Sequence, residues 1–514
     1  MNLFQRSRQP QWKICLESSN FHFDRIHLRE YDKKLQTCPV SYRGGVFYDT
    51  NLKRVDNMRE KASGNKFEMD MCSGSILKKL LLFCIPLMFS SVLQLLFNAA
   101  DVIVVGKFAG DEALAAVGSN TALINLLVNF FMGLSIGANV LVARFYGAKQ
   151  EKALSETVHT AMLLSILSGI FLTIVGVLGA RTLLEWMQTP AEVIDLATIY
   201  LRIYFLGMTA NMVYNFGSAI LRAVGDTRRP LYFLMAAGIV NVILNLVFVI
   251  IFKMSVAGVA LATVISQCIS AGLIFYCLVK EQGSIHLNIR GLRIVPDKLV
   301  QIVRIGLPAS FQGMLFSFSN VIIQSSVNSF GSIVVAGNSA ASNIEGFVYV
   351  SMNAFYQGSI SFISQNVGAG KYERINRIVL TAELCVTAVG LVLGNLVVFC
   401  GKPLLSLYTS SPEVMAAGMK RLSVICSTYA LCGMMDTMVG VLRGLGYSIM
   451  PMLVSLVGAC GLRLFWIFTF FKLPAFHSIT SLYLTYPVSW FLTFATHVIC
   501  FLVIRRQLKK RWGQ

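Results

Sequence analysis

The sequence predicts an all-α polytopic membrane protein in which twelve transmembrane helices form two parallel six-helix repeats. Three observations predict this fold class. The 514-residue chain is 55% hydrophobic and only 13% charged, whereas a soluble protein carries about 25% charged residues. Apolar runs long enough to cross a bilayer, about 20 residues each, recur along the chain. The second half of the chain also repeats motifs of the first half.

The N-terminal segment, residues 1–70, is polar and lacks clear apolar periodicity, so we expect no cleavable signal peptide there. We expect this segment to be disordered. It is interpreted as a cytoplasmic tail, a binding arm, or translated sequence upstream of the true start. We favour the last interpretation, with Met58, Met69 and Met71 as alternative starts.

Twelve apolar segments follow, and the basic residues between them alternate. Approximately, the segments are 76–105, 112–143, 155–180, 192–221, 230–252, 257–279, 299–329, 332–362, 376–408, 413–442, 448–471 and 481–505. Lys and Arg concentrate in every second loop and in the C-terminal tail, and the positive-inside rule therefore places both termini in the cytoplasm. The expected regions are a polar segment at 1–70, an N-terminal six-helix lobe at 71–285, a cytoplasmic linker at 286–298, a C-terminal six-helix lobe at 299–507 and a basic cytoplasmic tail at 508–514.

The two lobes carry matching motifs, displaced by 221 or 222 residues. Because six helices separate the copies, the two halves share one orientation in the membrane and are parallel repeats. Transporter folds with such repeats place the site between the halves, which rock against each other. The matched pairs are Pro86 with Pro308, Asn98 with Asn320, FYGAKQ with NVGAGK, and LRAVGDTRRP with LRGLGYSIMP.

The composition argues against several function classes. The net charge of +19 is explained by the basic loops and not by nucleic-acid binding. The twelve Cys include no CxxC pair, the six His are dispersed, and neither type clusters at metal-ligand spacing. No Gly-rich phosphate loop, nucleophile elbow or HExxH sequence is present. We therefore expect no metal cofactor, no direct use of ATP and no enzymatic activity.

The main functional signal is the stretch IPLMFSSVLQLLFNAAD at 85–101. It ends in Asp101, and an ionisable side chain inside a bilayer costs roughly 2.5–3.5 kcal/mol on insertion scales. Gln94, Asn98 and Asp101 are spaced i, i+4 and i+7, which places them on one helix face. We interpret Asp101 as a proton- or cation-binding carboxylate, and the alternative is a structural acid hydrogen-bonded at the helix end. Its repeat counterpart is Ile323, so the acid is specific to the first half.

Further side chains in the apolar segments are candidates for the same cavity. The neutral candidates are Phe97, Asn215, Asn241, Asn245, Thr263 and Asn320. The alternative for the polar ones is hydrogen bonding between helices, worth about 0.6 kcal/mol on average. Two acids lie in the second half, Glu345 and Asp436, and Asp436 corresponds to Asn215 through the repeat. Each acid either takes part in ion coupling or belongs to a buried ion pair, for which Arg463 is a candidate partner.

Two backbone motifs are duplicated as well. Pro86 and Pro308 lie inside apolar segments, where proline kinks a helix, and the kinks are either hinges or static geometry. The LRxxG motifs join consecutive helices on the predicted cytoplasmic face. Their glycines permit tight turns, and we expect Arg222 and Arg443 at the level of the inner headgroups. We interpret these motifs as structural or gating elements.

The pattern P–x7–Q–x3–N–x2–D, followed by VGKFAGDEALAAVG, resembles the multidrug and toxic compound extrusion (MATE) family, and its bacterial DinF-type branch most closely. The YGAK, VGAGK, GVALATVISQ and LCGMMDTMVGVLRGLGYSIMPM segments strengthen the resemblance, which covers about residues 72–510. It implies a V-shaped pair of six-helix lobes in the bacterial inner membrane. It also implies a key carboxylate at Asp101, with Gln94, Asn241 and Thr263 as polar partners. The chain departs from many members of this branch at Asn245, where they carry a second Asp.

The expected function is secondary antiport: export of cationic or amphipathic small molecules, driven by a proton or sodium gradient. Binding of a proton or Na⁺ at Asp101 would neutralise its charge and favour outward release of substrate. We expect a monomer in the lipid bilayer, without a cofactor. The alternatives are a flippase for a lipid-linked precursor, which needs a large cationic cavity, and a non-transporting membrane receptor or a membrane enzyme.

Overall fold

The computed structural model describes residues 67–283 and 285–512, so most of the segment expected to be disordered, residues 1–70, lies outside the described residues. The helices of the first half are α3 (Ile76–Phe108), α4 (Asp111–Gly147), α5 (Glu151–Trp186), α6 (Ile194–Leu206), α7 (Met208–Ala223), α8 (Arg228–Leu246) with η1 (Val247–Ile251), and α9 (Ser255–Lys280). The linker contains η2 (Ile289–Gly291). The second half contains α10 (Pro296–Asn328), α11 (Ser332–Gly368), α12 (Arg374–Phe399), α13 (Gly401–Ser406), α14 (Pro412–Ile425), η3 (Cys426–Thr428), α15 (Tyr429–Gly444), α16 (Ile449–Ser455), η4 (Leu456–Gly461), α17 (Leu462–Phe468), η5 (Phe470–Lys472), η6 (Pro474–Phe476) and α18 (Ile479–Trp512).

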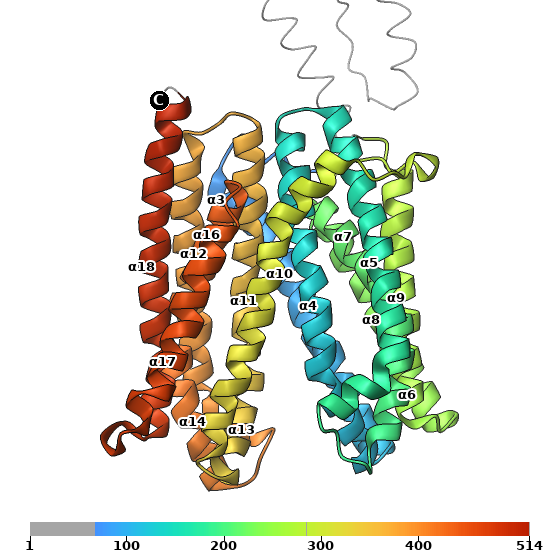
Figure 1. The fold of residues 1–514 in the computed structure, drawn as a ribbon, viewed down its shortest axis with the longest axis vertical. Helices are drawn as coiled ribbons and strands as arrows, with labels where there is room; N and C mark the ends of the chain where they lie inside the picture. The colour runs from blue at the N-terminus through green and yellow to red at the C-terminus, as the bar shows by residue number, and fades with distance from the viewer. Residues whose placement is uncertain (1–66, 284, 513–514) are drawn as a thin grey trace, which may run out of the picture. The chain divides into compact units, whose positions relative to one another are not determined.

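The all-helical membrane fold is confirmed. Among the described residues, ten helices are long and apolar enough to cross a membrane, and α6 with α7, bent by 46°, adds an eleventh span. α11 is the twelfth long helix: it has 37 residues and runs nearly the height of the molecule, but many Ser, Asn and Gln side chains lower its hydropathy. Each of the twelve predicted segments therefore corresponds to one helix or to consecutive helical pieces (Figure 1).

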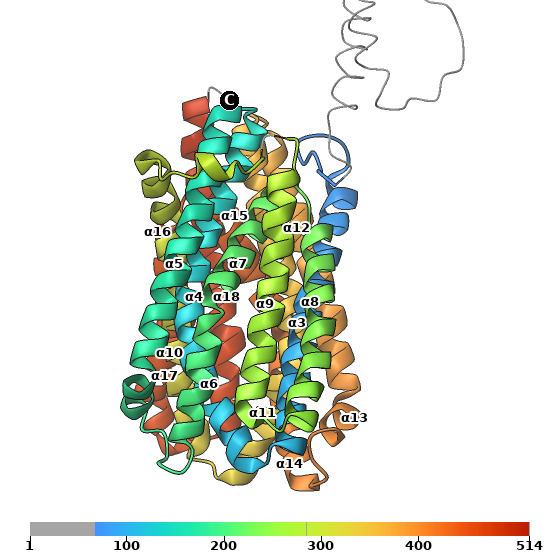
Figure 2. The ribbon, with the colours of Figure 1, turned by 90° about the vertical axis from the view of Figure 1, so that its right-hand side faces the viewer.

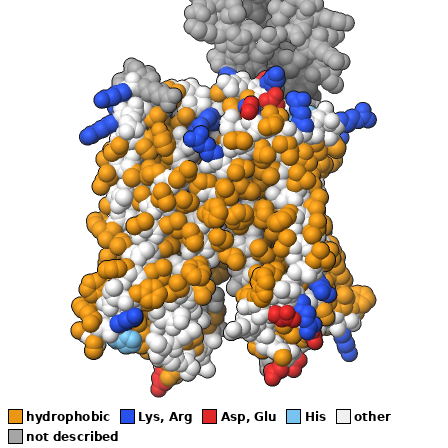
Figure 3. All heavy atoms as spheres, in the orientation of Figure 1, with side chains coloured by type: hydrophobic (Ala, Val, Ile, Leu, Met, Phe, Trp, Pro, Cys, Tyr) orange, Lys and Arg blue, Asp and Glu red, His pale blue; other side chains and the backbone are white. Residues whose placement is uncertain are grey.

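The charged side chains mark the two ends of this bundle. Figure 3 shows hydrophobic side chains in a band across the visible face, with charged ones toward both ends. We call the end that bears the C-terminus the basic end; Arg144, Arg229 and Arg374 lie there. The opposite end is the open end, because Figure 3 shows the surface hollowed between the two halves at that end.

Two helices pack against both halves of the chain. The beginning of α3 joins the core of the second half through Leu80 and Phe83, whereas its end joins a core of the first half through Val104. α10 makes the reciprocal crossing, and Figure 1 shows it running obliquely from the first half at the upper right to the second half at the lower left. Pro86 and Pro308 lie near the points at which each helix passes from one core to the other. This position is compatible with the predicted hinges.

The basic end is closed by glycine contacts that follow the repeat. A Cβ on Gly147 of α4 would lie 2.1 Å from the carbonyl oxygen of Gln365, and a Cβ on Gly368 of α11 would lie 1.9 Å from that of Arg144. Only glycine permits backbones to approach this closely. The YGAK and VGAGK motifs therefore form the seam between the halves, which we call the glycine seam.

The LRxxG motifs form the tight turns that the sequence predicts. Gly225 and Gly446 have φ values of +93° and +100°, a region that side chains disfavour. The expectation that Arg443 lies at the headgroups is wrong: it is only 4% exposed and donates hydrogen bonds to the Tyr356 hydroxyl and, at 2.8 Å, to Gln312. These buried acceptors stabilise the guanidinium inside the protein, where an unpaired charge would be costly.

Candidate functional site

Asp101 lies in a hydrogen-bonded network contributed by three helices. Asn245 of α8 donates to its Oδ1 atom, and the Thr263 hydroxyl of α9 lies 3.5 Å from its Oδ2 atom. The Asn245 amide also donates to Asn241 Oδ1 at 3.3 Å, and Asn241 donates to Thr263 at 3.5 Å. Figure 2 shows α3 beside α8 and α9. We call Asp101, Asn241, Asn245 and Thr263 the Asp101 network.

The sequence spacing explains this arrangement. Asn241 and Asn245 are one helical turn apart, so both face α3 from the same side of α8. Both amides are buried, at 4% and 1% exposure, and a buried amide requires hydrogen-bond partners. Within the described residues, the partners of Asp101 are neutral, and it forms no ion pair. An acid held only by neutral groups can take up a proton or a small cation without first breaking a salt bridge.

The other residues predicted on the Asp101 helix face do not join this network. Gln94 and Asn98 are exposed and lie one to two turns from Asp101 toward the basic end, and they form no hydrogen bond within the described part of the chain. Phe97 packs on α8, where a Cβ on Gly238 would lie 1.9 Å from its ring. Asn320 of α10 is exposed as well. Their predicted role in lining a substrate cavity stays a prediction.

Glu345 forms a buried ion pair with Arg421 of α14, and both side chains are less than a tenth exposed. Arg421 also donates to Asn338 at 2.7 Å, and the Tyr483 hydroxyl donates to the same Asn338 oxygen at 3.2 Å. This geometry supports the structural interpretation of Glu345, while a role in coupling stays a prediction. Arg463, expected as a partner for an acid, instead donates to Ser489 at 2.8 Å and lies over aromatic rings.

Asp436 is half-buried on α15, with the side chain of Tyr349 of α11 beside it. Its repeat counterpart, Asn215, donates to the Asn211 carbonyl at 2.9 Å and to the Asn211 side chain at 2.7 Å. Neither Asp436 nor Asn215 belongs to the Asp101 network. The predicted site residues therefore form separate clusters in the two halves.

Sequence reasoning missed two charged residues within the helices of the second half. Arg421 is buried and paired with polar groups, and Glu383 of α12 has two buried carboxylate oxygens without a hydrogen-bond partner in the described residues. Their presence inside predicted apolar segments was the available signal, because such residues usually mark function or specific pairing.

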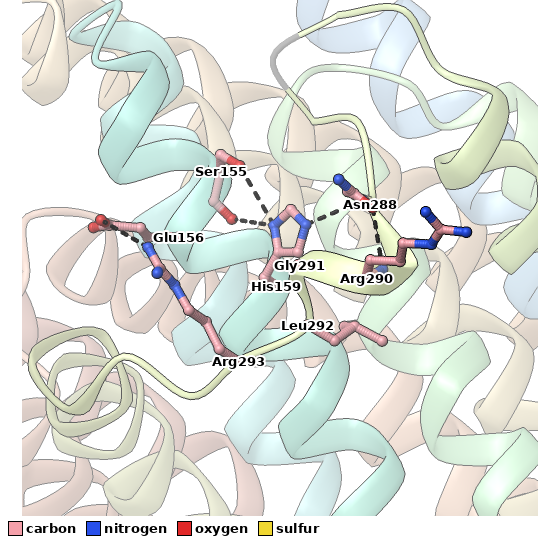
Figure 4. Close-up of a pocket in the computed structure, with 8 residues that line it drawn as sticks. All are labelled: Ser155, Glu156, His159, Asn288, Arg290, Gly291, Leu292 and Arg293. Atoms are coloured by element: carbon pink, nitrogen blue, oxygen red, sulfur yellow. Dashed lines mark hydrogen bonds and ion pairs between the residues drawn. The ribbon is translucent and has the colours of Figure 1, made fainter.

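A hollow of about 380 Å³ lies between the beginning of α5 and the linker. His159 accepts a hydrogen bond from the Asn288 backbone N–H at 3.1 Å, and its other ring nitrogen lies 2.7 Å from the Ser155 carbonyl oxygen. Figure 4 shows Arg290 and Arg293 pointing to opposite sides of the imidazole. The two cations do not converge on one ligand, so this hollow is the place where the linker is fastened to α5.

These features define a class: a membrane protein of two repeated halves, closed at one end and hollowed at the other, with polar groups held between its helices, has the architecture of a transporter. The MatE family model matches the chain twice, over residues 86–247 and 308–469. The two matches begin at Pro86 and Pro308, which confirms the duplication. The chain belongs to the MATE family.

Curated relatives cover most of the chain. A probable multidrug resistance protein of Bacillus subtilis, YoeA, is 28% identical over 396 residues, which are 76% of this chain and 86% of that protein. The probable multidrug resistance protein NorM of Thermotoga maritima is 25% identical, over 76% of this chain and 84% of that protein. The FAD transporter of Shewanella oneidensis is 24% identical, over 67% and 77%.

Solved structures show the same fold. An outward-facing multidrug resistance MATE family transporter has a TM-score of 0.80 at 21% identity, covering 87% of this chain and 99% of that chain. A MOP superfamily transporter from Pyrococcus furiosus also has a TM-score of 0.80 at 21% identity, covering 86% and 98%.

Proposed function

We propose that this protein is a secondary antiporter that exports small cationic or amphipathic compounds in exchange for protons or sodium ions. The observation that carries the proposal is the Asp101 network, in which the single carboxylate of α3 is held by neutral donors from α8 and α9. Two relatives named as probable multidrug resistance proteins support the substrate class. A proton or sodium gradient is the energy source.

The geometry supports a coupling mechanism at Asp101. A proton or Na⁺ entering from the open end neutralises the carboxylate, which weakens its attraction for the amide of Asn245 and the hydroxyl of Thr263. The ion must prefer one conformation and the substrate the other, because a ligand shifts an equilibrium only by its differential affinity. The positive-inside rule supports a cytoplasmic location for the basic end, and the proposal accordingly assigns the open end to the outside of the cell.

The substrate class is tested together with the coupling ion. Purified protein is reconstituted in vesicles, and efflux of cationic dyes and drugs is followed under an imposed pH or sodium gradient. FAD is included, because one relative is named as an FAD transporter and FAD is an anion. We expect gradient-dependent flux of cations that is lost in Asp101→Asn.

Three other results would contradict the proposal. Flux of FAD without flux of any cationic compound would contradict the proposed substrate class. Movement of a lipid-linked precursor without dependence on either gradient would indicate the flippase. Binding of a ligand without flux under any gradient would indicate a receptor.

A further inference from the structure

The segment that precedes α3 lies across the closed seam. We call residues 67–74 the strap. The Met69 N–H donates to the Val224 carbonyl at 3.1 Å, in the LRxxG turn of the first half. Two residues later, the Met71 N–H donates to Gln365 Oε1 at 3.2 Å, at the end of α11 in the second half. The backbone of the strap therefore bridges the two halves.

Met71 anchors the strap. Its side chain is fully buried and belongs to the core that contains Leu80 and Phe362. Asn366 donates from its amide to the Met71 carbonyl at 3.1 Å. Both backbone polar groups of Met71 are thus satisfied by the second half, as a buried peptide requires.

Side-chain contacts fasten the strap to each half separately. On the first half, the Tyr146 hydroxyl donates to Glu68 Oε2 at 2.8 Å. On the second half, Lys371 Nζ donates to the Cys72 carbonyl at 3.0 Å, and Arg374 donates to the Gly74 carbonyl at 3.1 Å. Cys72 is only 8% exposed as a result of this seating.

The linker before α10 differs from the strap because its contacts are to one half only. Its backbone is held by His159 and Thr160, which receive the Asn288 and Val295 N–H groups at 3.1 Å each. Both acceptors lie on α5, in one half. Rocking of the halves therefore leaves these linker contacts in place, whereas it must break strap contacts on one side.

We propose that the strap holds the basic end closed by binding to both halves, and that it dissociates from one half when that end opens. N–H···O hydrogen bonds in proteins span about 2.7–3.2 Å between heavy atoms, so the two halves do not separate while the strap is bound to both. Release of the strap shifts the equilibrium toward the state open at the basic end. The proposal rests on the proposed function in one respect: it requires that the protein alternate between a state open at the open end and a state open at the basic end.

The test uses the full chain in lipid nanodiscs and needs no transport. The first measurement is the alkylation rate of Cys72 by a maleimide, with the other Cys replaced by Ala. The second is the spin-label distance between Lys152→Cys and Glu373→Cys, exposed repeat-equivalent positions at the basic end, in a chain without other Cys. Met71→Asp removes the anchor by placing a carboxylate in an apolar seat, and Met71→Leu is the matched control. Lys371→Met removes one tether without altering the core.

We expect Met71→Asp to raise the Cys72 alkylation rate by about tenfold or more, corresponding to about 1.4 kcal/mol, and to lengthen the distance between the labels. Lys371→Met should change both in the same direction by less, and Met71→Leu should change neither. Faster alkylation without a longer distance would show that the strap is passive packing and overturn the proposal. If Met71→Asp does not fold, unchanged values in Lys371→Met overturn it. The efflux assay fails or succeeds independently of both measurements.

Discussion

Arg144 and Gln365 occupy equivalent positions at the ends of α4 and α11, and each reaches across the glycine seam to the LRxxG turn of the opposite half. Arg144 donates to the Gly444 carbonyl at 3.3 Å, and Gln365 donates to the Ala223 carbonyl at 2.7 Å. The closure of the basic end is therefore pseudo-symmetric, as expected when two parallel repeats meet. The two contacts differ in charge, because Arg144 of the first half is a cation whereas Gln365 of the second half is neutral.

The glycine seam gives the first prediction. Gly147→Ala places a Cβ 2.1 Å from a backbone carbonyl oxygen. Because the backbone at this contact can shift only at an energetic cost, we expect the substitution to destabilise the closed state by about 1–3 kcal/mol. The two halves should separate at the basic end, which a spin-label distance across that end reports. Gly346→Ala is the control, because a Cβ there meets no atom within 4 Å. Equal distances in both variants would show that the seam does not hold the closed state.

The sequence predicted the helices and the duplication because each leaves a pattern in the chain, whereas the partners expected for Asp101 were implied by the family resemblance. Hydropathy locates the spans, and the i, i+4 spacing of Asn241 and Asn245 indicates a polar face. The packing partners of each helix were not predictable, because an apolar face is compatible with many neighbours. The crossing of α3 and α10 between the halves and the partners of Arg421 and Arg443 therefore appear only in three dimensions.

The Asp101 network gives the second prediction. Asp101→Asn keeps hydrogen-bonding capacity toward Asn245 and Thr263 but removes the titratable charge, so the protein should fold while gradient-driven efflux falls by at least about tenfold, equivalent to about 1.4 kcal/mol. Vesicle efflux with and without the gradient measures this loss. Asn98→Ala, on the same helix face but outside the network, should retain its dependence on the gradient. Unchanged efflux in Asp101→Asn would remove this residue from coupling.

Substitutions of the two acids of the second half, Glu345 and Asp436, should differ in how much they destabilise the protein. Glu345→Gln leaves Arg421 as a buried unpaired charge, and breaking such a pair costs about 3–5 kcal/mol. Asp436→Asn keeps a side-chain oxygen beside Tyr349, so the loss of stability should be about 1 kcal/mol or less. Thermal unfolding in detergent compares the two variants. A stable Glu345→Gln protein without gradient-driven efflux would instead assign Glu345 to coupling.

Glu68 gives the strap a pH dependence. Burial raises the pKa of Glu68 above its ordinary value of 4.5, and the Tyr146 hydrogen bond only partly opposes this, while Glu281, Asp226 and Arg229 are the nearby charged groups. A carboxyl whose pKa is raised in the seated strap binds its proton more tightly there than after release. The contribution of Glu68 to the free energy of strap binding is therefore fully present below about pH 4.5, and it is lost as the pH rises through the raised pKa of Glu68.

The fraction of molecules closed at the basic end should consequently fall as the pH increases from 4.5 toward neutrality. The spin-label distance between positions 152 and 373 measures this fraction over the pH series. Glu68→Gln, which keeps an acceptor for Tyr146 but does not titrate, should flatten the dependence. Burial also raises the pKa of Asp226, which is paired with Arg229, and the Arg229 guanidinium lies 5.2 Å from the centroid of the Phe67 ring in the strap. A pH dependence of full size in Glu68→Gln would therefore assign the effect to Asp226 and not to Glu68.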